Sequence, residues 1–130
     1  MLTDQLFIEL VKAASQAPSA DNMQPWEFCK KDNTIEVFCA KNRMLPTDVN
    51  GMFTWVSIGA AIQNIVVMAS SKDLESTVEY FTPDSNDKPA AVVRFSKGKA
   101  DRRLAKFISL RTTNRSIYET LPLEQSVISQ

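Results

Sequence analysis

The chain has 130 residues, of which 44% are hydrophobic and 23% charged, so it has the size and composition of one globular domain or of a piece of a larger protein. Fifteen basic residues balance fifteen acidic ones, so the net charge gives no general attraction to nucleic acid or membranes. The chain contains no histidine, which excludes Ser-His and Cys-His nucleophiles, most zinc sites and the usual general base at neutral pH.

The first predicted element is a helix over residues 4–16. It is capped by Thr3 or Asp4 and ended by Ala17-Pro18, because the residue before a proline is disfavoured in a helix. Apolar side chains recur on one face at helical spacing: Leu6, Phe7, Leu10, Val11 and Ala14.

Two alternating segments, Trp26–Lys31 and Thr34–Ala40, predict a β-hairpin that turns at Asp32-Asn33. This pairing gathers five side chains on the face that we expect to meet the core: Trp26, Phe28, Ile35, Val37 and Cys39. Cys29 then lies on the opposite face, so we expect no disulfide between the two cysteines.

A long helix is predicted over Met52–Ser71, with Asp48 or Asn50 as its N-terminal cap. It is apolar almost all round and approaches the length of ~20 residues that crosses a membrane. Three polar side chains in its middle argue against a membrane span: Ser57, Gln63 and Asn64. We therefore predict a long central helix that is buried on most sides or partly covered by a subunit interface.

Two strands are expected at Thr77–Phe81 and Ala90–Ser96, joined by the surface loop Thr82–Pro89. Residues 100–110 predict a short amphipathic helix with Leu104, Phe107 and Ile108 on one side. The element order α-β-β-α-β-β-α indicates an α+β fold with an antiparallel sheet flanked by helices.

Positive charge gathers near the end of the chain. Residues 94–115 hold eight basic side chains and one acidic, a net charge of +7. This field favours an anion, such as a phosphate. Nucleic-acid binding is a weaker alternative, because the segment has little aromatic interleaving.

The sequence APSADNMQPWEF, residues 17–28, follows the first helix directly. Its composition alone fits an ordinary connector, since Pro, Ser, Asp and Asn all favour turns. The chain has three glycines, Gly51, Gly59 and Gly98, and they form neither a GxGxxG motif nor a Walker loop.

The spacing P-S-x-x-N-x-Q-P-W-x-F, from Pro18 to Phe28, resembles a loop of the FMN-dependent nitroreductase family. In that family the loop reaches across a dimer interface and lines the flavin. The resemblance implies that Ser19, Ala20 and Asn22 contact the flavin.

Residues 111–115, R-T-T-N-R, are similar to the Arg-x-Ser-x-Arg/Lys motif of the same family. The resemblance implies that Arg111, Thr113 and Arg115 hold the FMN phosphate and ribityl chain, with Tyr118 as an aromatic neighbour. Guanidinium groups bind phosphate through charge-assisted hydrogen bonds. The alternative is a solvated basic segment. Ser57–Asn64 is likewise similar to the family's central helix at the dimer interface.

The order of these motifs is reversed relative to an ordinary member, in which the Arg motif precedes the loop. The chain resembles the branch of the family built from two tandem nitroreductase-like halves. Residues 1–110 would then be a first half, and residues 111–130 the start of a second half or a C-terminal extension.

The resemblance implies a flavin (FMN)-dependent oxidoreductase that passes electrons from NAD(P)H to a nitroaromatic, quinone or similar acceptor. The flavin carries this chemistry, so no catalytic side chain is nominated. We expect a homodimer with no bound metal, nucleic acid or membrane, and a cytoplasmic location, because no signal peptide is evident. Two alternatives stay open: a flavin-binding or flavin-sequestering protein without turnover, and an incomplete fragment that acts only as a dimerising module.

Overall fold

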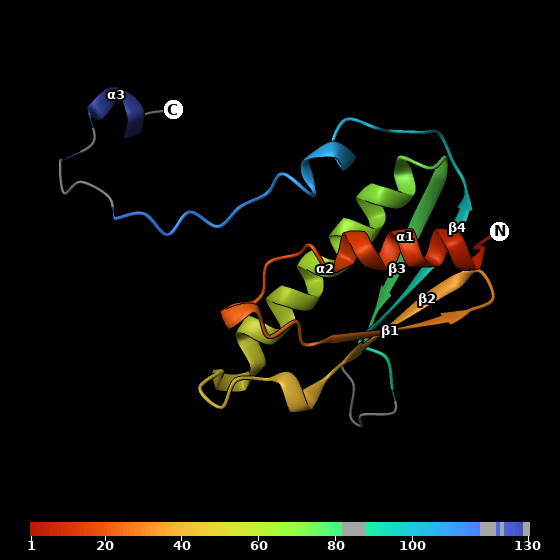
Figure 1. The fold of residues 1–130 in the computed structure, drawn as a ribbon, viewed down its shortest axis with the longest axis horizontal. Coiled ribbons are helices and arrows are strands. Elements are labelled where there is room, and N and C mark those ends of the chain that lie inside the picture. Colours follow the sequence, from red (N-terminus) through yellow and green to blue (C-terminus); the bar gives the residue numbers. More distant parts are fainter. Residues whose placement is uncertain (82–87, 118–121, 123, 129–130) are drawn as a thin grey trace.

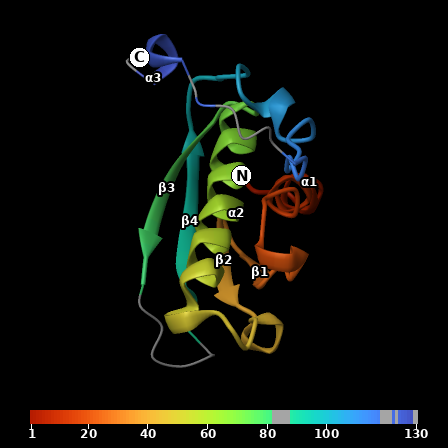
Figure 2. The ribbon, with the colours of Figure 1, turned by 90° about the vertical axis from the view of Figure 1, so that its left-hand side faces the viewer.

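The structure is a computed structural model that describes residues 1–81, 88–117, 122 and 124–128. Four strands form one antiparallel sheet in the order β1-β2-β4-β3. Both long helices, α1 and α2, lie on the same side of this sheet (Figures 1 and 2). The elements are α1 (Asp4–Ala14), β1 (Trp26–Lys31), β2 (Thr34–Cys39), α2 (Met52–Ser70), β3 (Leu74–Tyr80), β4 (Ala91–Lys97) and a short α3 (Gln125–Ile128).

Helix α1 begins where the sequence predicts. The Thr3 hydroxyl accepts a hydrogen bond from the Leu6 N–H at 3.2 Å, which caps the first turn. The helix ends at Ala14, two residues before the predicted end, and the backbone then tightens into a turn in which Ala17 N–H bonds to Ala14 O. Leu10 and Ala14 on its inner face are fully buried.

The hairpin has the predicted register. Trp26 pairs with Cys39, Phe28 with Val37, and Lys31 with Thr34. The inner face is the predicted one, since Trp26, Ile35 and Val37 are buried. Both cysteines are free, with Cys29 exposed and Cys39 half-buried.

Helix α2 is the centre of the core. Its inner side buries Ile58, Ile62 and Ile65 against the sheet and α1, and the Asn64 amide donates to Ala13 O of α1 at 3.0 Å. The opposite side of its first turns is exposed, at Met52, Phe53, Trp55 and Val56. We predicted that this helix is buried on most sides or partly covered by a subunit interface. Among the described residues, only one side of α2 is buried.

By length and composition alone, residues Val49–Ser70 would be long and apolar enough to cross a membrane. A single helix of this kind is weak evidence for a span, because the core helix of a folded domain has the same properties. The packing of α2 against both α1 and the sheet is that of a core helix.

Strand β3 begins at Leu74, three residues before the predicted start, because Leu74, Ser76 and Val78 alternate inward along the same face. Strand β4 runs from Ala91 to Lys97, close to prediction. Most of the predicted loop Thr82–Pro89 lies outside the described residues.

The predicted helix over residues 100–110 is wrong. Only one 3₁₀ turn forms, at Ala105–Phe107, and Leu104 and Phe107 are exposed. Two bonds compete with a helix here. Asp101 N–H donates to Ser70 O at the end of α2, and the Asp101 carboxylate accepts from the neighbouring Arg103 guanidinium at 2.7 Å. A helix this short needs packing of its apolar face, and that face has little here.

The start of α2 depends on Asp48. Its carboxylate accepts hydrogen bonds from the N–H groups of Phe53 and Thr54 at 2.9 and 2.8 Å and from the Thr54 hydroxyl at 2.7 Å. Partial burial raises the pKa of Asp48, but these three hydrogen bonds outweigh that effect and hold the pKa below its ordinary value. Gly51 stands at the N-cap position itself, and Asp48, one of the two predicted candidates, supplies the side chain that caps the first turn.

Replacing Asp48 with Asn tests this cap. A carboxylate whose pKa is lowered on folding stabilises the fold above its unfolded pKa of about 3.8, and this contribution is lost as the pH falls further. We expect Asp48→Asn to lower the melting temperature at pH 7 by roughly 3–8 °C. The difference from the unmodified protein should shrink below pH 3.8. Circular dichroism melts at both pH values measure it. Asp32→Asn, in the exposed hairpin turn, is the control, and an equal pH-dependent loss there would contradict the cap.

Candidate functional site

The loop between α1 and β1 has an unusual backbone. Asp21, Asn22 and Gln24 take positive φ angles of 46°, 57° and 49°, although none is a glycine. Each such residue costs about 1–3 kcal/mol when the surroundings force the conformation on it. Three of them within four positions make this the most strained segment among the described residues.

Hydrogen bonds within the loop hold this conformation. The Ser19 hydroxyl accepts from the Gln24 N–H at 3.0 Å, and the Asn22 side-chain oxygen accepts from the Gln24 side-chain amide at 3.3 Å. Ser19 is half-buried and Asn22 is exposed. Two of the three predicted contact residues, Ser19 and Asn22, therefore belong to one hydrogen-bonded turn that a ligand could approach.

Ala20 faces the other way. It lines a cavity of about 10 Å³ between the loop and the start of α2, next to Pro25, Thr54 and Ser57. This space is no larger than a water molecule needs. A flavin ring would therefore have to lie outside the loop, where Ala20 could offer only its backbone.

Arg43 holds the end of the loop through hydrogen bonds to its backbone, a role that the sequence does not predict. Its guanidinium donates to the carbonyl oxygens of Gln24 and Trp26, both at 3.3 Å. Arg43 lies 19 residues from Gln24 in a different segment. No local sequence pattern connects the two, so only the fold brings them together.

The structure places Arg111 next to the loop. Its guanidinium donates to Gln16 O at the end of α1 at 3.4 Å and to the Thr113 hydroxyl at 3.1 Å. Gln16 is three residues before Ser19. Arg111 is thus held against the backbone just after α1, at Gln16, which is two residues before Pro18, the first residue of the loop motif.

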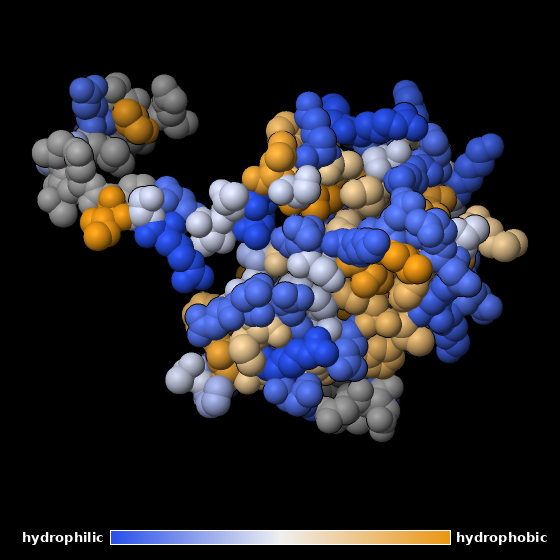
Figure 3. All heavy atoms as spheres, in the orientation of Figure 1, coloured by the Kyte–Doolittle hydropathy of each residue, from blue (hydrophilic) through white to orange (hydrophobic). Residues whose placement is uncertain are grey.

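The rest of the basic motif leads away from the body. Residues 111–117 are exposed and form neither helix nor strand. They extend outward as a mainly hydrophilic segment in Figures 1 and 3. Arg115 lies on this segment beyond Thr113. Tyr118 lies outside the described residues.

The donor set at Arg111 fits a phosphate. Because the Thr113 hydroxyl accepts from Arg111, its own hydrogen remains available to donate to a ligand. A guanidinium and a hydroxyl side by side on an exposed surface match the oxygens of a phosphate monoester. The residues present therefore suit the phosphate end of FMN.

Other basic side chains of residues 94–115 are paired. Arg94 lies 3.6 Å from Glu79, and Arg102 lies 3.5 Å from Asp73. Hydrogen bonds from Arg103 lower the pKa of Asp101 to about 2. The local charge of +7 is thus partly neutralised by acidic residues elsewhere in the chain.

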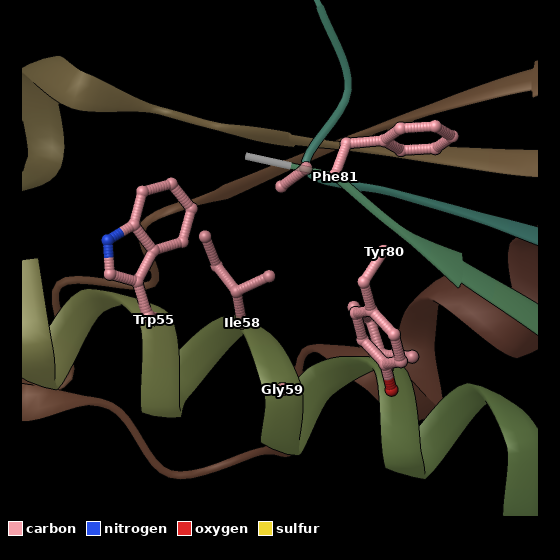
Figure 4. A pocket seen from close by; sticks show the side chains of 7 residues that line it. Trp55, Ile58, Gly59, Tyr80 and Phe81 are labelled. Carbon is pink, nitrogen blue, oxygen red and sulfur yellow. The ribbon is translucent and has the colours of Figure 1, made fainter. Parts of the chain in front are cut away.

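An apolar cavity of about 330 Å³ lies between α2 and the end of β3. Trp55 and Ile58 rise toward it from α2, and Tyr80 points into it from the strand (Figure 4). The sequence does not predict this cavity, because the side chains that line it have the pattern of ordinary core residues. Its lining residues are Trp55, Ile58, Gly59, Ile62, Tyr80, Phe81 and Ala90.

Within the part of the chain that the structure describes, no three His, Cys, Asp or Glu side chains are grouped so that they could hold a metal ion.

Comparisons with known proteins identify the fold. No family model matches the chain. A nitroreductase family protein from Clostridium difficile 630 superposes with a TM-score of 0.59 at 16% identity, over 92% of this chain and 88% of that one. The nitroreductase family protein from Streptococcus pneumoniae TIGR4 gives a TM-score of 0.56 at 13% identity, over 98% of this chain and 89% of that one. The predicted α+β, nitroreductase-like fold is therefore confirmed.

The sequence itself is similar to longer proteins. The Mycobacterium tuberculosis H37Rv protein named "Putative NAD(P)H nitroreductase acg" is 31% identical over 137 aligned positions, which cover all of this chain. The chain spans 41% of that relative's length. A second protein of that strain, "Putative NAD(P)H nitroreductase Rv3131", is 31% identical over 85% of the chain, which spans 33% of it. Fold and relatives thus agree, and the chain is nitroreductase-like.

Proposed function

We propose that this chain is part of an FMN-dependent oxidoreductase of nitroreductase type. In this proposal NAD(P)H donates electrons, and a nitroaromatic, quinone or similar molecule accepts them. One observation carries it: the Arg111 guanidinium reaches Gln16, three residues from Ser19, so that a phosphate-binding donor and the flavin-type loop lie at one end of the fold.

The proposed roles follow from the donors present. Arg111 and Thr113 would bind the FMN phosphate, with Arg115 and the outward segment closing over it. Ser19 and Asn22 would donate to the edge of the ring, and Ala20 would offer its backbone N–H. When bound, FMN supplies the hydride and electron transfer, which explains why a chain without histidine suffices.

We further propose that a second nitroreductase-like unit covers the exposed side of α2. Four large apolar side chains are exposed there: Met52, Phe53, Trp55 and Val56. Apolar surface of this kind on a helix is typical of an interface. The unit could be a second copy, giving a homodimer, or a second half that begins at residue 111, with residues 1–110 as the first half. Either arrangement suits a cytoplasmic protein and leaves α2 away from lipid.

A second candidate function is flavin binding without turnover. It is favoured by the exposed, outward course of residues 111–117, which leaves the phosphate site open in this chain. Such a protein would hold FMN but would not let NAD(P)H reduce it. A fragment that only dimerises would not bind FMN.

Replacing Arg111 with Ala tests the phosphate site. A charge-assisted hydrogen bond is worth about 1.5–3 kcal/mol, so we expect the Kd for FMN to rise roughly 10–150-fold. FMN fluorescence quenching measures the Kd, and anaerobic addition of NADH, followed by loss of the flavin's visible band, tests turnover.

Arg94→Ala is the matched control, because Arg94 pairs with Glu79 on the outer face of the sheet. Equal losses in both variants would mean a general charge effect and would contradict the site. Tight FMN binding without NADH reduction would favour the flavin-storing alternative.

Replacing Gly59 tests the interface. A Cβ added at Gly59 meets nothing within 4 Å, so a larger side chain is tolerated by the isolated chain. We expect Gly59→Arg to convert dimers to monomers without lowering the melting temperature of the monomer, since arginine also favours helices over glycine. Gly59→Ala should still dimerise and should be slightly more stable, since alanine favours helices over glycine by about 1 kcal/mol. Sedimentation velocity reads the mass. Dimers that persist in Gly59→Arg would place the interface elsewhere.

A further inference from the structure

Gln24 is the hub of the strained loop. Its N–H donates to the Ser19 hydroxyl, its side-chain amide donates to the Asn22 oxygen, and its carbonyl accepts from Arg43 and from Trp26 N–H. Gln24 thus bonds to the side chains of two of the three predicted flavin contacts, Ser19 and Asn22. Gln24 does this at a φ of 49° directly before Pro25, a costly position for a residue with a long side chain.

These bonds fix which polar atoms remain for a ligand. A serine hydroxyl has one hydrogen to donate, and here its oxygen already accepts from Gln24, which leaves that hydrogen free. The Asn22 oxygen accepts from Gln24 with one of its two lone pairs, while its NH₂ group keeps two hydrogens to donate to a ligand. Both side chains therefore present donors.

We propose that Gln24 is a positioning residue that sets the polarity of the loop, so that Ser19 and Asn22 act as a pair of hydrogen-bond donors. The ligand edge that they recognise must then carry acceptor atoms, such as ring carbonyl oxygens or unprotonated ring nitrogens. This inference rests on the proposed function for its ligand, FMN. The polarity itself is a property of the loop alone and can be measured without ligand.

Gln24→Glu separates polarity from structure. The glutamate side chain has the same size, and its backbone N–H still reaches Ser19. Its carboxylate cannot donate to the Asn22 oxygen, so the Asn22 amide should turn over and donate its NH₂ to the carboxylate. The ligand would then meet an acceptor where it needs a donor.

The first arm of the experiment uses the protein without ligand. Side-chain amide NMR of the intact chain should show the Asn22 NH₂ protons exchanging freely in the unmodified protein and protected in Gln24→Glu. Unchanged exchange between the two proteins would overturn the inference, whatever FMN does.

The second arm titrates FMN. We expect Gln24→Glu to weaken binding roughly 5–30-fold and to shift the bound flavin's visible band toward that of free FMN, with the melting temperature unchanged. If affinity and spectrum stay the same, the inference is overturned. If the melting temperature falls together with the affinity for FMN, Gln24 has only a structural role, and this result also overturns the inference. If the unmodified protein does not bind FMN, the proposed function fails. The NMR experiment without ligand then tests by itself whether Ser19 and Asn22 present donors.

Gln24→Gly tests whether stability and FMN binding change in opposite directions. Glycine adopts positive φ without cost, so this variant should be at least as stable as the unmodified protein, yet it should bind FMN more weakly because the side-chain amide is lost. Asp32→Gly relieves a φ of 50° in the hairpin turn at the other end of β1, and it should leave FMN binding unchanged. A loss of affinity in Asp32→Gly equal to that in Gln24→Gly would remove the special role of Gln24.

Discussion

Burial of one side of helix α2 organises this fold. Ile58, Ile62 and Ile65 recur at helical spacing and are almost fully enclosed by α1 and the sheet. Complete burial of side chains of this size stabilises the fold by about 1.5–3 kcal/mol each. Helix α2 packs against both α1 and the sheet. This packing fixes the path of the loop that leaves α1 and passes the start of α2. The proposed flavin-binding loop is therefore held in place by the core.

The loop combines strain with dense hydrogen bonding. Residues at positive φ cost free energy, and bonds from Gln24 and Arg43 offset that cost. Strained but well-ordered segments are typical of binding sites, where they hold donors in place before a ligand arrives. Arg111 bonds to the carbonyl of Gln16 just after α1, so a cation lies close in sequence to the start of this loop.

Much of the fold could be predicted from the sequence, because local patterns determine it. The hairpin register follows from alternation around Asp32-Asn33, and the start of α1 follows from Thr3. The prediction of a helix at residues 100–110 was wrong, because the bond from Asp101 N–H to Ser70 O depends on the tertiary fold and cannot be seen in the local pattern. Arg43 and the cavity beside Trp55 were missed for the same reason: both join segments that share no local pattern. The roles of Ser19, Ala20, Asn22, Arg111, Thr113 and Arg115 stay predictions.

Sedimentation velocity of the purified chain with FMN, followed at the flavin's visible band, tests the central claim most directly. The account predicts that the flavin sediments with the protein at the mass of a dimer, because the loop would bind the flavin and a second copy would cover the exposed side of α2. Flavin that stays at the position of free FMN, while the protein sediments as a monomer or a dimer, would contradict the claim that this chain forms a flavin site.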